Sequence, residues 1–217
     1  LNPVSEDQSS RSLKLPDEFK PFSGKPSSRL FVDYLMSPAR GLTKYETEFV
    51  TQDFDLHYCT RGPYRGRIIF PIYFEDKLVG WTGRTIYPHE ELRYKTLSAD
   101  PEKAKAEGYP PAVKMNTNYL LWYDDLWRTK ADTIFLNEGP FDSLKVKLLG
   151  HDYGVTATCF FTAAPSEVQL ALLQKVLPRF KKRYLLLDQG TLPMALKVAG
   201  QLTGLGVKVK QLPAGVK

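Results

Sequence analysis

Two different hydrophobic patterns divide the chain. From residue 131 onward, short apolar runs alternate with stretches of helical periodicity, which is typical of a parallel sheet with helices between its strands. We predict strands at Thr133–Asn137, Val155–Phe160, Arg183–Asp188 and Val207–Leu212, and helices at about 140–149, 165–177 and 192–203. An α/β unit over residues 131–217 is therefore expected.

Residues 27–130 have a different pattern, centred on a predicted β-hairpin. Arg67–Phe74 and Leu78–Ile86 are rich in β-branched and aromatic residues and flank a turn at Glu75–Lys77. Pro71 indicates an edge position or a bulge, and Gly80 and Gly83 indicate bulges or the close approach of a ligand to the backbone. The other predicted elements are helices capped by Ser27–Ser28 and by Thr43, strands at 56–60, 93–98 and 119–123, and short helices at 100–108 and 124–129. We therefore expect a second, α+β unit.

The first 26 residues are rich in Ser, Pro and charged side chains. Few large apolar residues follow Leu15 in this stretch, apart from Phe19 and Phe22. Such a segment buries little apolar surface, so we expect a flexible N-terminal arm over residues 1–26.

Candidate chemistry lies where two strands of the α/β unit end. The strand at Thr133–Asn137 is followed by Glu138, a glycine, and a helix that begins at about Pro140 and carries Asp142 in its first turn. The strand at Arg183–Asp188 also ends in a carboxylate. Ligands of open α/β sheets bind at the carboxyl ends of the strands, and paired carboxylates suit a hard cation such as Mg²⁺. On its own, however, Glu138 is better explained as an ordinary solvated carboxylate at a strand end.

The net charge and the composition indicate which kinds of partner this chain has. The net charge of +6 and the pI of about 9.2 favour an anionic partner such as nucleic acid or nucleotide. No apolar run approaches the roughly 20 residues that span a bilayer, so no membrane partner is expected. Cys59 and Cys159 lack metal-site spacing, so we expect no zinc site; two unpaired cysteines suit a reducing cytoplasm.

Four segments, taken in order, resemble the catalytic core of bacterial and phage DNA primases. They are GRIIFPIYFEDKLVGWTGRTI (66–86), RYKTLS (93–98), LNEGPFDSLK (136–145) and YLLLDQG (184–190). LNEGPFD is similar to the Glu-Gly-x-x-Asp signature of a TOPRIM domain, and YLLLDQG partly matches the second motif of that domain, Asp-x-Asp. The resemblance covers roughly residues 27–217 and is closest to phage-type primase-like proteins.

The resemblance implies an α+β primase-core subdomain over 27–130, followed by an α/β TOPRIM domain with a mainly parallel sheet over 131–217. It implies a nucleotidyltransferase that makes short RNA primers on single-stranded DNA with Mg²⁺ or Mn²⁺. The implied partners are the single-stranded DNA template, ribonucleoside triphosphates and a replicative helicase. The implied location is the cytoplasm, that of the host cell if the gene is a phage gene.

The resemblance also implies roles for particular residues. Glu138 and Asp188 would be catalytic and would hold the metal, with Asp142 as a further metal ligand. The side chains matching the basic face of the primases, which would contact template and nucleotide, are Arg67, Arg84, Arg93 and Lys95, and the nearby rings that could stack on bases are Tyr64, Trp81 and Tyr94.

One position departs from the family pattern. The second aspartate of Asp-x-Asp falls at position 190, which is Gly190. Two other functions therefore stay open: a non-catalytic nucleic-acid-binding module, and a TOPRIM nuclease. The hairpin motif favours the primase over the nuclease.

Overall fold

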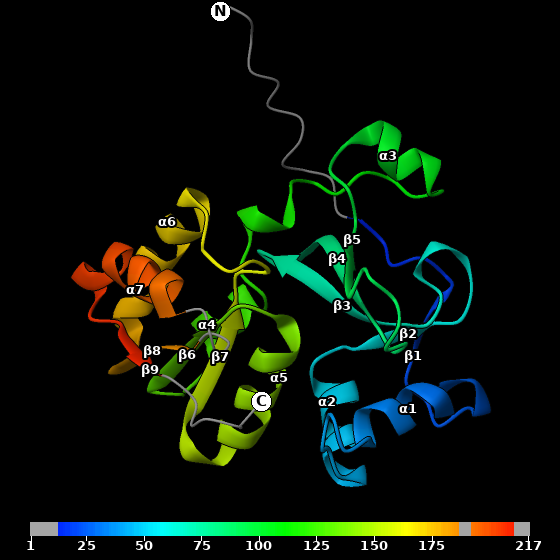
Figure 1. The fold of residues 1–217 in the computed structure, drawn as a ribbon, viewed down its shortest axis with the longest axis horizontal. Coiled ribbons are helices and arrows are strands. Elements are labelled where there is room, and N and C mark those ends of the chain that lie inside the picture. Colours follow the sequence, from blue (N-terminus) through cyan, green and yellow to red (C-terminus); the bar gives the residue numbers. More distant parts are fainter. Residues whose placement is uncertain (1–12, 187–191, 211–217) are drawn as a thin grey trace, which may run out of the picture. The chain divides into compact units, whose positions relative to one another are not determined.

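The computed structural model describes residues 13–186 and 192–210, and the chain forms two compact units (Figure 1). The first unit is Leu1–Met115 and the second unit is Asn116–Lys217. Each has its own sheet, one antiparallel and one parallel, as the two sequence patterns predicted. The boundary lies earlier in the chain than residue 130, where it was expected.

The sheet of the first unit is antiparallel throughout, in the order β1-β2-β3-β4-β5. Its strands are β1 Phe19–Pro21, β2 His57–Cys59, β3 Arg67–Phe74, β4 Lys77–Thr85 and β5 Tyr94–Thr96. The predicted hairpin is β3–β4, joined by Glu75 and Asp76 with φ angles of 51° and 60°. Two left-handed residues match the twist of a tight hairpin, so this expectation is confirmed.

Pro71 and the two glycines of the hairpin have structural roles. Pro71 pairs with Trp81 of β4 and lies beyond the part of β3 that β2 covers, so its missing N–H leaves no ladder bond unmade. The register shifts between Ile72 and Tyr73, which places a bulge beside Gly80, as predicted. A Cβ on Gly83 would lie 2.9 Å from Tyr64 Cδ1, so this glycine makes room for a core ring.

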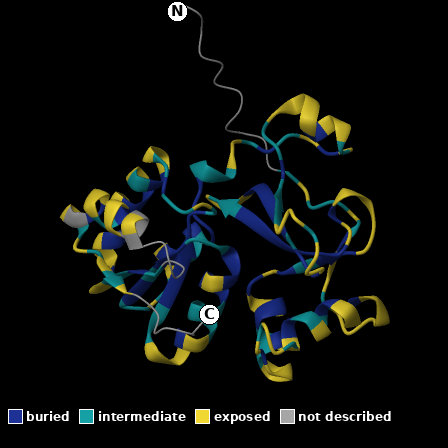
Figure 2. Cartoon of the chain, in the orientation of Figure 1, coloured by how far each residue is buried: buried dark blue, intermediate teal, exposed yellow. Residues whose placement is uncertain are grey.

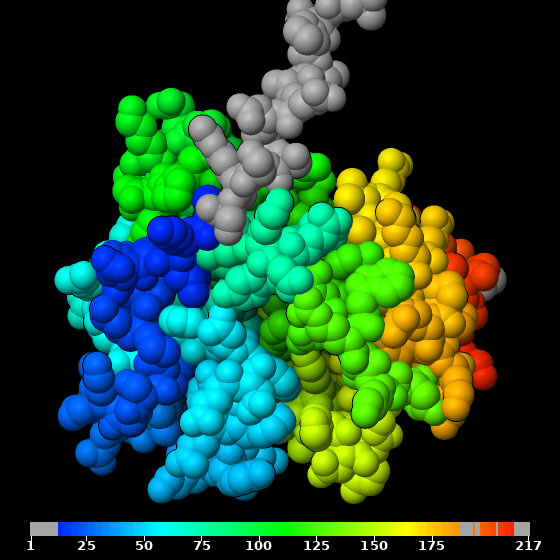
Figure 3. All heavy atoms as spheres, turned by 180° about the vertical axis from the view of Figure 1, so that it is seen from behind, coloured from blue at the N-terminus to red at the C-terminus, as the bar shows by residue number. Residues whose placement is uncertain are grey.

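The helices of the first unit follow the capping signals in part. They are α1 Arg29–Met36, α2 Lys44–Asp53 and α3 Pro101–Ala106, with single 3₁₀ turns at Pro26–Ser28 and Gly62–Tyr64. Thr43 and Glu46 form a full capping box at α2, as expected for Thr43. Ser28 precedes α1 but its hydroxyl makes no cap; it donates to Lys25 O instead. The blue and cyan atoms of α1 and α2, which pack together, lie side by side in Figure 3.

Part of the expected flexible arm is ordered. β1 pairs with β2 through Phe19 and Cys59, and Phe19 is 4% exposed. Its ring meets Tyr64 and Trp81 edge-on, both at 5.4 Å between centroids. The structure therefore corrects the expectation for Leu13–Pro26, because one buried aromatic ring anchors this stretch to the sheet.

The second unit holds a parallel sheet in the order β7-β6-β8-β9, which confirms the predicted α/β pattern. Its strands are β6 Thr133–Asn137, β7 Val155–Cys159, β8 Lys182–Leu186 and β9 Lys208–Lys210. Its helices are α4 Tyr123–Arg128, α5 Pro140–Gly150, α6 Glu167–Val176 and α7 Leu192–Gln201, with 3₁₀ turns at Asn116–Asn118, His151–Tyr153, Leu177–Arg179 and Thr203–Leu205. β6 and β7 are the largely buried strands of this sheet (Figure 2), whereas β8 has one buried residue and β9 has none.

The predicted strand at 119–123 does not form. Its backbone is held by other means: the buried Gln169 side chain donates to Tyr119 O at 2.6 Å, and Thr158 Oγ1 donates to Leu121 O at 2.7 Å. These bonds tie the segment to α6 and β7, which explains why the second unit begins before residue 131. Among the helices of the described residues, none is long and apolar enough to cross a membrane.

Candidate active site at the end of β6

The strand–glutamate–helix connection forms as predicted. Glu138 follows the last residue of β6 and is half-buried. Gly139 is the N-cap of α5 with φ −116° and ψ 157°, and Pro140 occupies the first turn. Asp142 is exposed in that same turn, so two carboxylates lie within five residues of each other at the start of α5.

Two polar residues that the sequence analysis did not single out support this connection. Asn137 is fully buried, and its amide donates to Ser143 Oγ at 3.0 Å. Its backbone carbonyl accepts from Phe160 N–H at 3.2 Å, which joins the ends of β6 and β7. Asn137 thus locks the strand end to the first turn of α5, directly before Glu138. The available signal was a polar residue ending an otherwise apolar strand.

The end of β7 beside this lock is apolar and neutral. Cys159 lies opposite Asn137 in the parallel register and is fully buried. Burial raises the pKa of the Cys159 thiol, with a smaller contribution from the negative charge of Asp142. The thiol is therefore protonated at neutral pH, and it does not offer the thiolate that a metal or a nucleophilic role needs.

The partner strand β8 runs toward the same edge of the sheet. It is parallel to β6, with Leu136 opposite Leu185, and its described part ends at Leu186. Asp188 and Gly190 follow but lie outside the described residues, so the pairing of Glu138 with Asp188 stays a prediction. Among the residues that the structure describes, no group of three or more His, Cys, Asp and Glu is placed to hold a metal ion.

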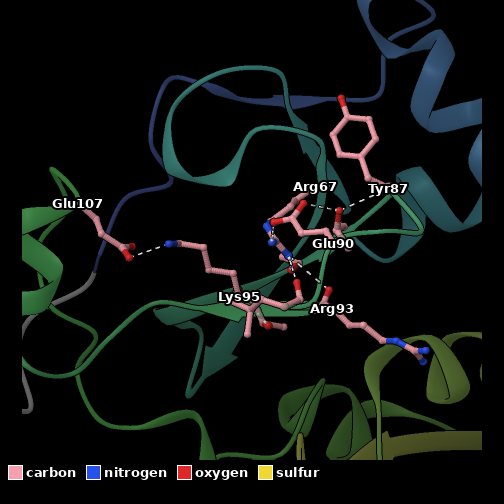
Figure 4. Close-up of polar contacts among 10 residues, drawn as sticks. Arg67, Tyr87, Glu90, Arg93, Lys95 and Glu107 are labelled. Atoms are coloured by element: carbon pink, nitrogen blue, oxygen red, sulfur yellow. Dashed lines mark hydrogen bonds and ion pairs between the residues drawn. The ribbon is translucent and has the colours of Figure 1, made fainter.

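Arg67 was expected on a phosphate-binding face, and the structure corrects this. Arg67 is 1% exposed, and its guanidinium donates to three backbone carbonyls and to Glu90 (Figure 4). A phosphate could reach it only if those contacts broke. The sequence pattern gave no sign of this, because the partners lie 16 to 26 residues further along the chain.

Trp81 and Tyr64 were expected to stack on bases, but both are 0% exposed. They belong to one aromatic cluster with Phe19 and Tyr109. Trp81 meets Tyr109 edge-on at 5.7 Å between centroids. Both rings are core residues of the first unit. Trp81 is buried because β4 is covered on both faces rather than on one, and Tyr64 lies in the 3₁₀ turn before β3.

The remaining predicted contacts divide between the two faces of the sheet. Arg84 lies over the Tyr94 ring at 4.9 Å, and the two residues are paired across β4 and β5. Lys95 projects to the opposite face, where it donates to Glu107 at 2.6 Å. Arg93 is exposed just before β5. Of the residues predicted to contact nucleic acid, the structure leaves Arg93 exposed and Arg84 and Tyr94 half-buried. Lys95 is also half-buried, but its ammonium group is already in an ion pair with Glu107.

Comparison with solved structures now identifies the architecture. The primase of Aquifex aeolicus, solved as its zinc-binding and RNA polymerase domains, superposes with a TM-score of 0.56 at 19% identity, over 89% of this chain and 51% of that one. The fold is primase-like. The primase fragment of the bacteriophage T7 primase-helicase protein gives a TM-score of 0.56 at 17% identity, over 82% of this chain and 64% of that one.

The primase-like chain thus spans between half and two thirds of the length of these two structures. No protein-family model and no curated protein matches the sequence. The expectation of a primase-like fold with an antiparallel and a separate parallel sheet is confirmed by the structure and by both neighbours.

Proposed function

We propose that this protein is the catalytic core of a DNA primase, which synthesises short RNA primers on single-stranded DNA. The observation that carries the proposal is the position of Glu138. It stands at the carboxyl end of a central strand of a parallel sheet, ahead of a helix with Asp142 in its first turn, within a primase-like fold. Carboxyl ends of such strands are where α/β proteins bind their ligands. The second unit is accordingly proposed to be a TOPRIM domain.

The donors at this edge suit a divalent metal. Glu138 and Asp142 offer hard carboxylate oxygens, and Mg²⁺ keeps several waters and needs only one or two protein carboxylates. Asp188 is proposed as the further ligand. When bound, the metal would neutralise negative charge on the α-phosphate and on the departing pyrophosphate.

The protein's own residues would orient the substrates. The hydrogen bond from Asn137 to Ser143 holds the end of β6 directly before Glu138. The Glu138 carboxylate would accept a proton from the attacking hydroxyl. The Arg84 guanidinium lies over the Tyr94 ring. Arg93 and Arg84 of the first unit would supply positive charge for template or triphosphate oxygens. Such contacts give affinity without base specificity.

A template-directed primer assay with Mg²⁺ or Mn²⁺ tests the proposal. Glu138→Gln preserves shape and removes the charge, and we expect primer synthesis to fall by about 10²–10⁴-fold. Glu167→Gln is the control, because Glu167 is an exposed acid in the first turn of α6 in the same unit. No primers from the wild-type chain, or equal activity of Glu138→Gln and wild type, contradicts the proposal.

One sequence feature favours a second function. Gly190 replaces the second aspartate of Asp-x-Asp, which removes one metal ligand of the family pattern. A chain without a working metal site would bind nucleic acid and catalyse nothing. Titration with Mg²⁺ separates the two: salt-sensitive DNA binding with no Mg²⁺ binding indicates the non-catalytic module. DNA cleavage that depends on Glu138 would instead indicate a nuclease.

A further inference from the structure

The loop between β4 and β5 is fastened to two adjacent residues at the start of β3. The first is Gly66, whose φ of +70° and missing side chain make room for the Tyr87 ring. A Cβ at Gly66 would come 2.2 Å from Tyr87 Cε2. The backbone agrees with this docking, since Ile86 N–H donates to Gly66 O at 2.9 Å.

The second residue is the buried Arg67, which spans the loop from inside. Its Nη1 lies 3.1 Å from Gly83 O on β4, and 3.0 Å and 3.3 Å from Leu92 O and Arg93 O at the far end of the loop. One guanidinium group therefore holds the strand before the loop and the residues after it. These carbonyls are local acceptors that a phosphate group would have to displace.

Glu90 completes the fastening from the middle of the loop. One of its oxygens accepts from Arg67 Nη2, and the other accepts from Thr85 Oγ1 at 2.9 Å (Figure 4). The Thr85 hydroxyl in turn accepts from Tyr87 N–H at 3.1 Å. Both carboxylate oxygens are thus engaged, and Glu90 is the carboxylate that neutralises the buried Arg67 charge.

The loop ends at Arg93, and these contacts bind the backbone of that residue and not its side chain. Arg93 O accepts from Arg67 and from Thr85 N–H, the latter at 3.0 Å. Its side chain is exposed, and its guanidinium points away from the cluster (Figure 4). A fixed backbone with a free-standing cationic side chain is how a phosphate-binding arginine is presented to a ligand.

We propose that Arg67 and Glu90 form a latch that positions Arg93 for contact with nucleic-acid phosphates, and that Arg67 itself is not a phosphate ligand. This rests on the proposed function, because it assigns Arg93 to the template or nucleotide. Arg67 and Glu90 are positioning residues. If Arg67 turned outward, Glu90 and three backbone carbonyls would each lose one hydrogen-bond donor.

For one substitution, the latch and long-range electrostatics predict opposite changes in DNA-binding affinity. Glu90→Gln removes a negative charge, so long-range attraction alone would tighten DNA binding. The latch predicts weaker binding, because the glutamine amide cannot serve both Arg67 and Thr85 as an acceptor. Glu91→Gln is the matched control: Glu91 is the exposed neighbour, and its substitution changes the charge equally.

Hydrogen exchange measured on the folded full chain tests the latch without reference to activity. In Glu90→Gln we expect the amides of Tyr87 and Arg93 to exchange about tenfold faster than in wild type, as for loss of a charge-assisted hydrogen bond. Glu91→Gln should leave both rates unchanged. Equal exchange in the two variants would overturn the latch.

Binding to a fluorescent single-stranded oligonucleotide, at several salt concentrations, tests the positioning. We expect Glu90→Gln to raise the Kd severalfold and to lower the salt slope by up to about one, as for one lost phosphate contact. In an Arg93→Gln background Glu90→Gln should have no further effect. Arg67→Lys, which keeps the charge, should weaken binding as Glu90→Gln does.

The outcomes separate this inference from the proposed function. A wild-type chain that binds no DNA refutes the proposed function and the assignment of Arg93, while exchange still decides whether the latch exists. A loosened loop with unchanged or tighter DNA binding in Glu90→Gln refutes the positioning role. Retained affinity in Arg67→Lys shows that a positive charge alone suffices at position 67, which also overturns the proposal.

Discussion

Replacing Trp81 separates a core ring from a base-stacking ring. The residue lies on β4, in the hairpin whose sequence resembles that of DNA primases, and it is 0% exposed. Because the indole is buried, Trp81→Ala removes the largest side chain of the first unit's core. If the ring instead moves out to stack on bases, the same change mainly weakens DNA binding.

The expected loss of stability follows from the surroundings of the ring. Core Trp→Ala substitutions cost about 3–5 kcal/mol in free energy of unfolding. Trp81 meets Phe19, Tyr109 and Tyr64 edge-on at 5.4, 5.7 and 6.4 Å, and each such pair contributes about 0.5–1.5 kcal/mol beyond burial. We therefore expect about 5 kcal/mol for Trp81→Ala. Trp81→Phe keeps an aromatic ring and should cost only about 1.5 kcal/mol.

Urea unfolding followed by circular dichroism measures these values. The two units can unfold in separate steps, so the curve can show two transitions. The transition that Trp81→Ala shifts is assigned to the first unit. Trp127→Ala is the control, because Trp127 is 41% exposed in the second unit and carries Arg179 over its ring at 5.2 Å. Its cost should be about 1 kcal/mol, in the other transition.

The result that would refute this reasoning is specific. A Trp81→Ala protein that unfolds within about 1 kcal/mol of wild type but has lost its affinity for single-stranded DNA places the ring at the nucleic acid. A Trp81→Phe protein that binds DNA as wild type does, with a small loss of stability, agrees with the core assignment.

Two further predictions concern the sheet interiors. Gly83→Ala places a Cβ 2.9 Å from the buried Tyr64 ring and should lower the free energy of unfolding in urea by about 1–3 kcal/mol. Gly80→Ala is the control, because a Cβ there meets only Ala112 Cβ at 3.7 Å and should change stability very little. Equal effects of the two substitutions would contradict the packing. Burial raises the pKa of the Cys159 thiol above that of the unfolded chain, so its contribution to stability is present at neutral pH and is lost as the pH rises above about 9. Thiol titration at that pH should find Cys159 unreactive in the folded protein and reactive in urea, and a reactive native thiol would refute it.

Local signals predicted most of the elements. The strand Thr133–Asn137 forms over the predicted residues, and the hairpin differs by one residue at each end of β4. These segments combine a clear apolar period with strong punctuation, such as Pro140 at a helix start or Glu75-Asp76 at a turn. The capping box at Thr43 was predictable for the same reason, since both of its partners lie within one helical turn.

The failures came from contacts distant in sequence. Tyr119–Tyr123 has a strand-like composition, yet Gln169 binds its backbone from 50 residues away and no strand forms. Arg67 was expected to be accessible because the sequence pattern does not show that Glu90, 23 residues further along the chain, binds its guanidinium. Burial of Trp81 likewise depends on Phe19, from a stretch whose composition indicated a flexible arm.

The two fastenings of the β4–β5 loop also limit how this segment can evolve. Gly66 and Arg67 are neighbours on the chain, while Tyr87 and Glu90 that meet them are three positions apart. An insertion or deletion between Tyr87 and Glu90 would therefore break one contact even if every side chain were kept. Among natural variants, a change at position 90 should accompany a change at position 67.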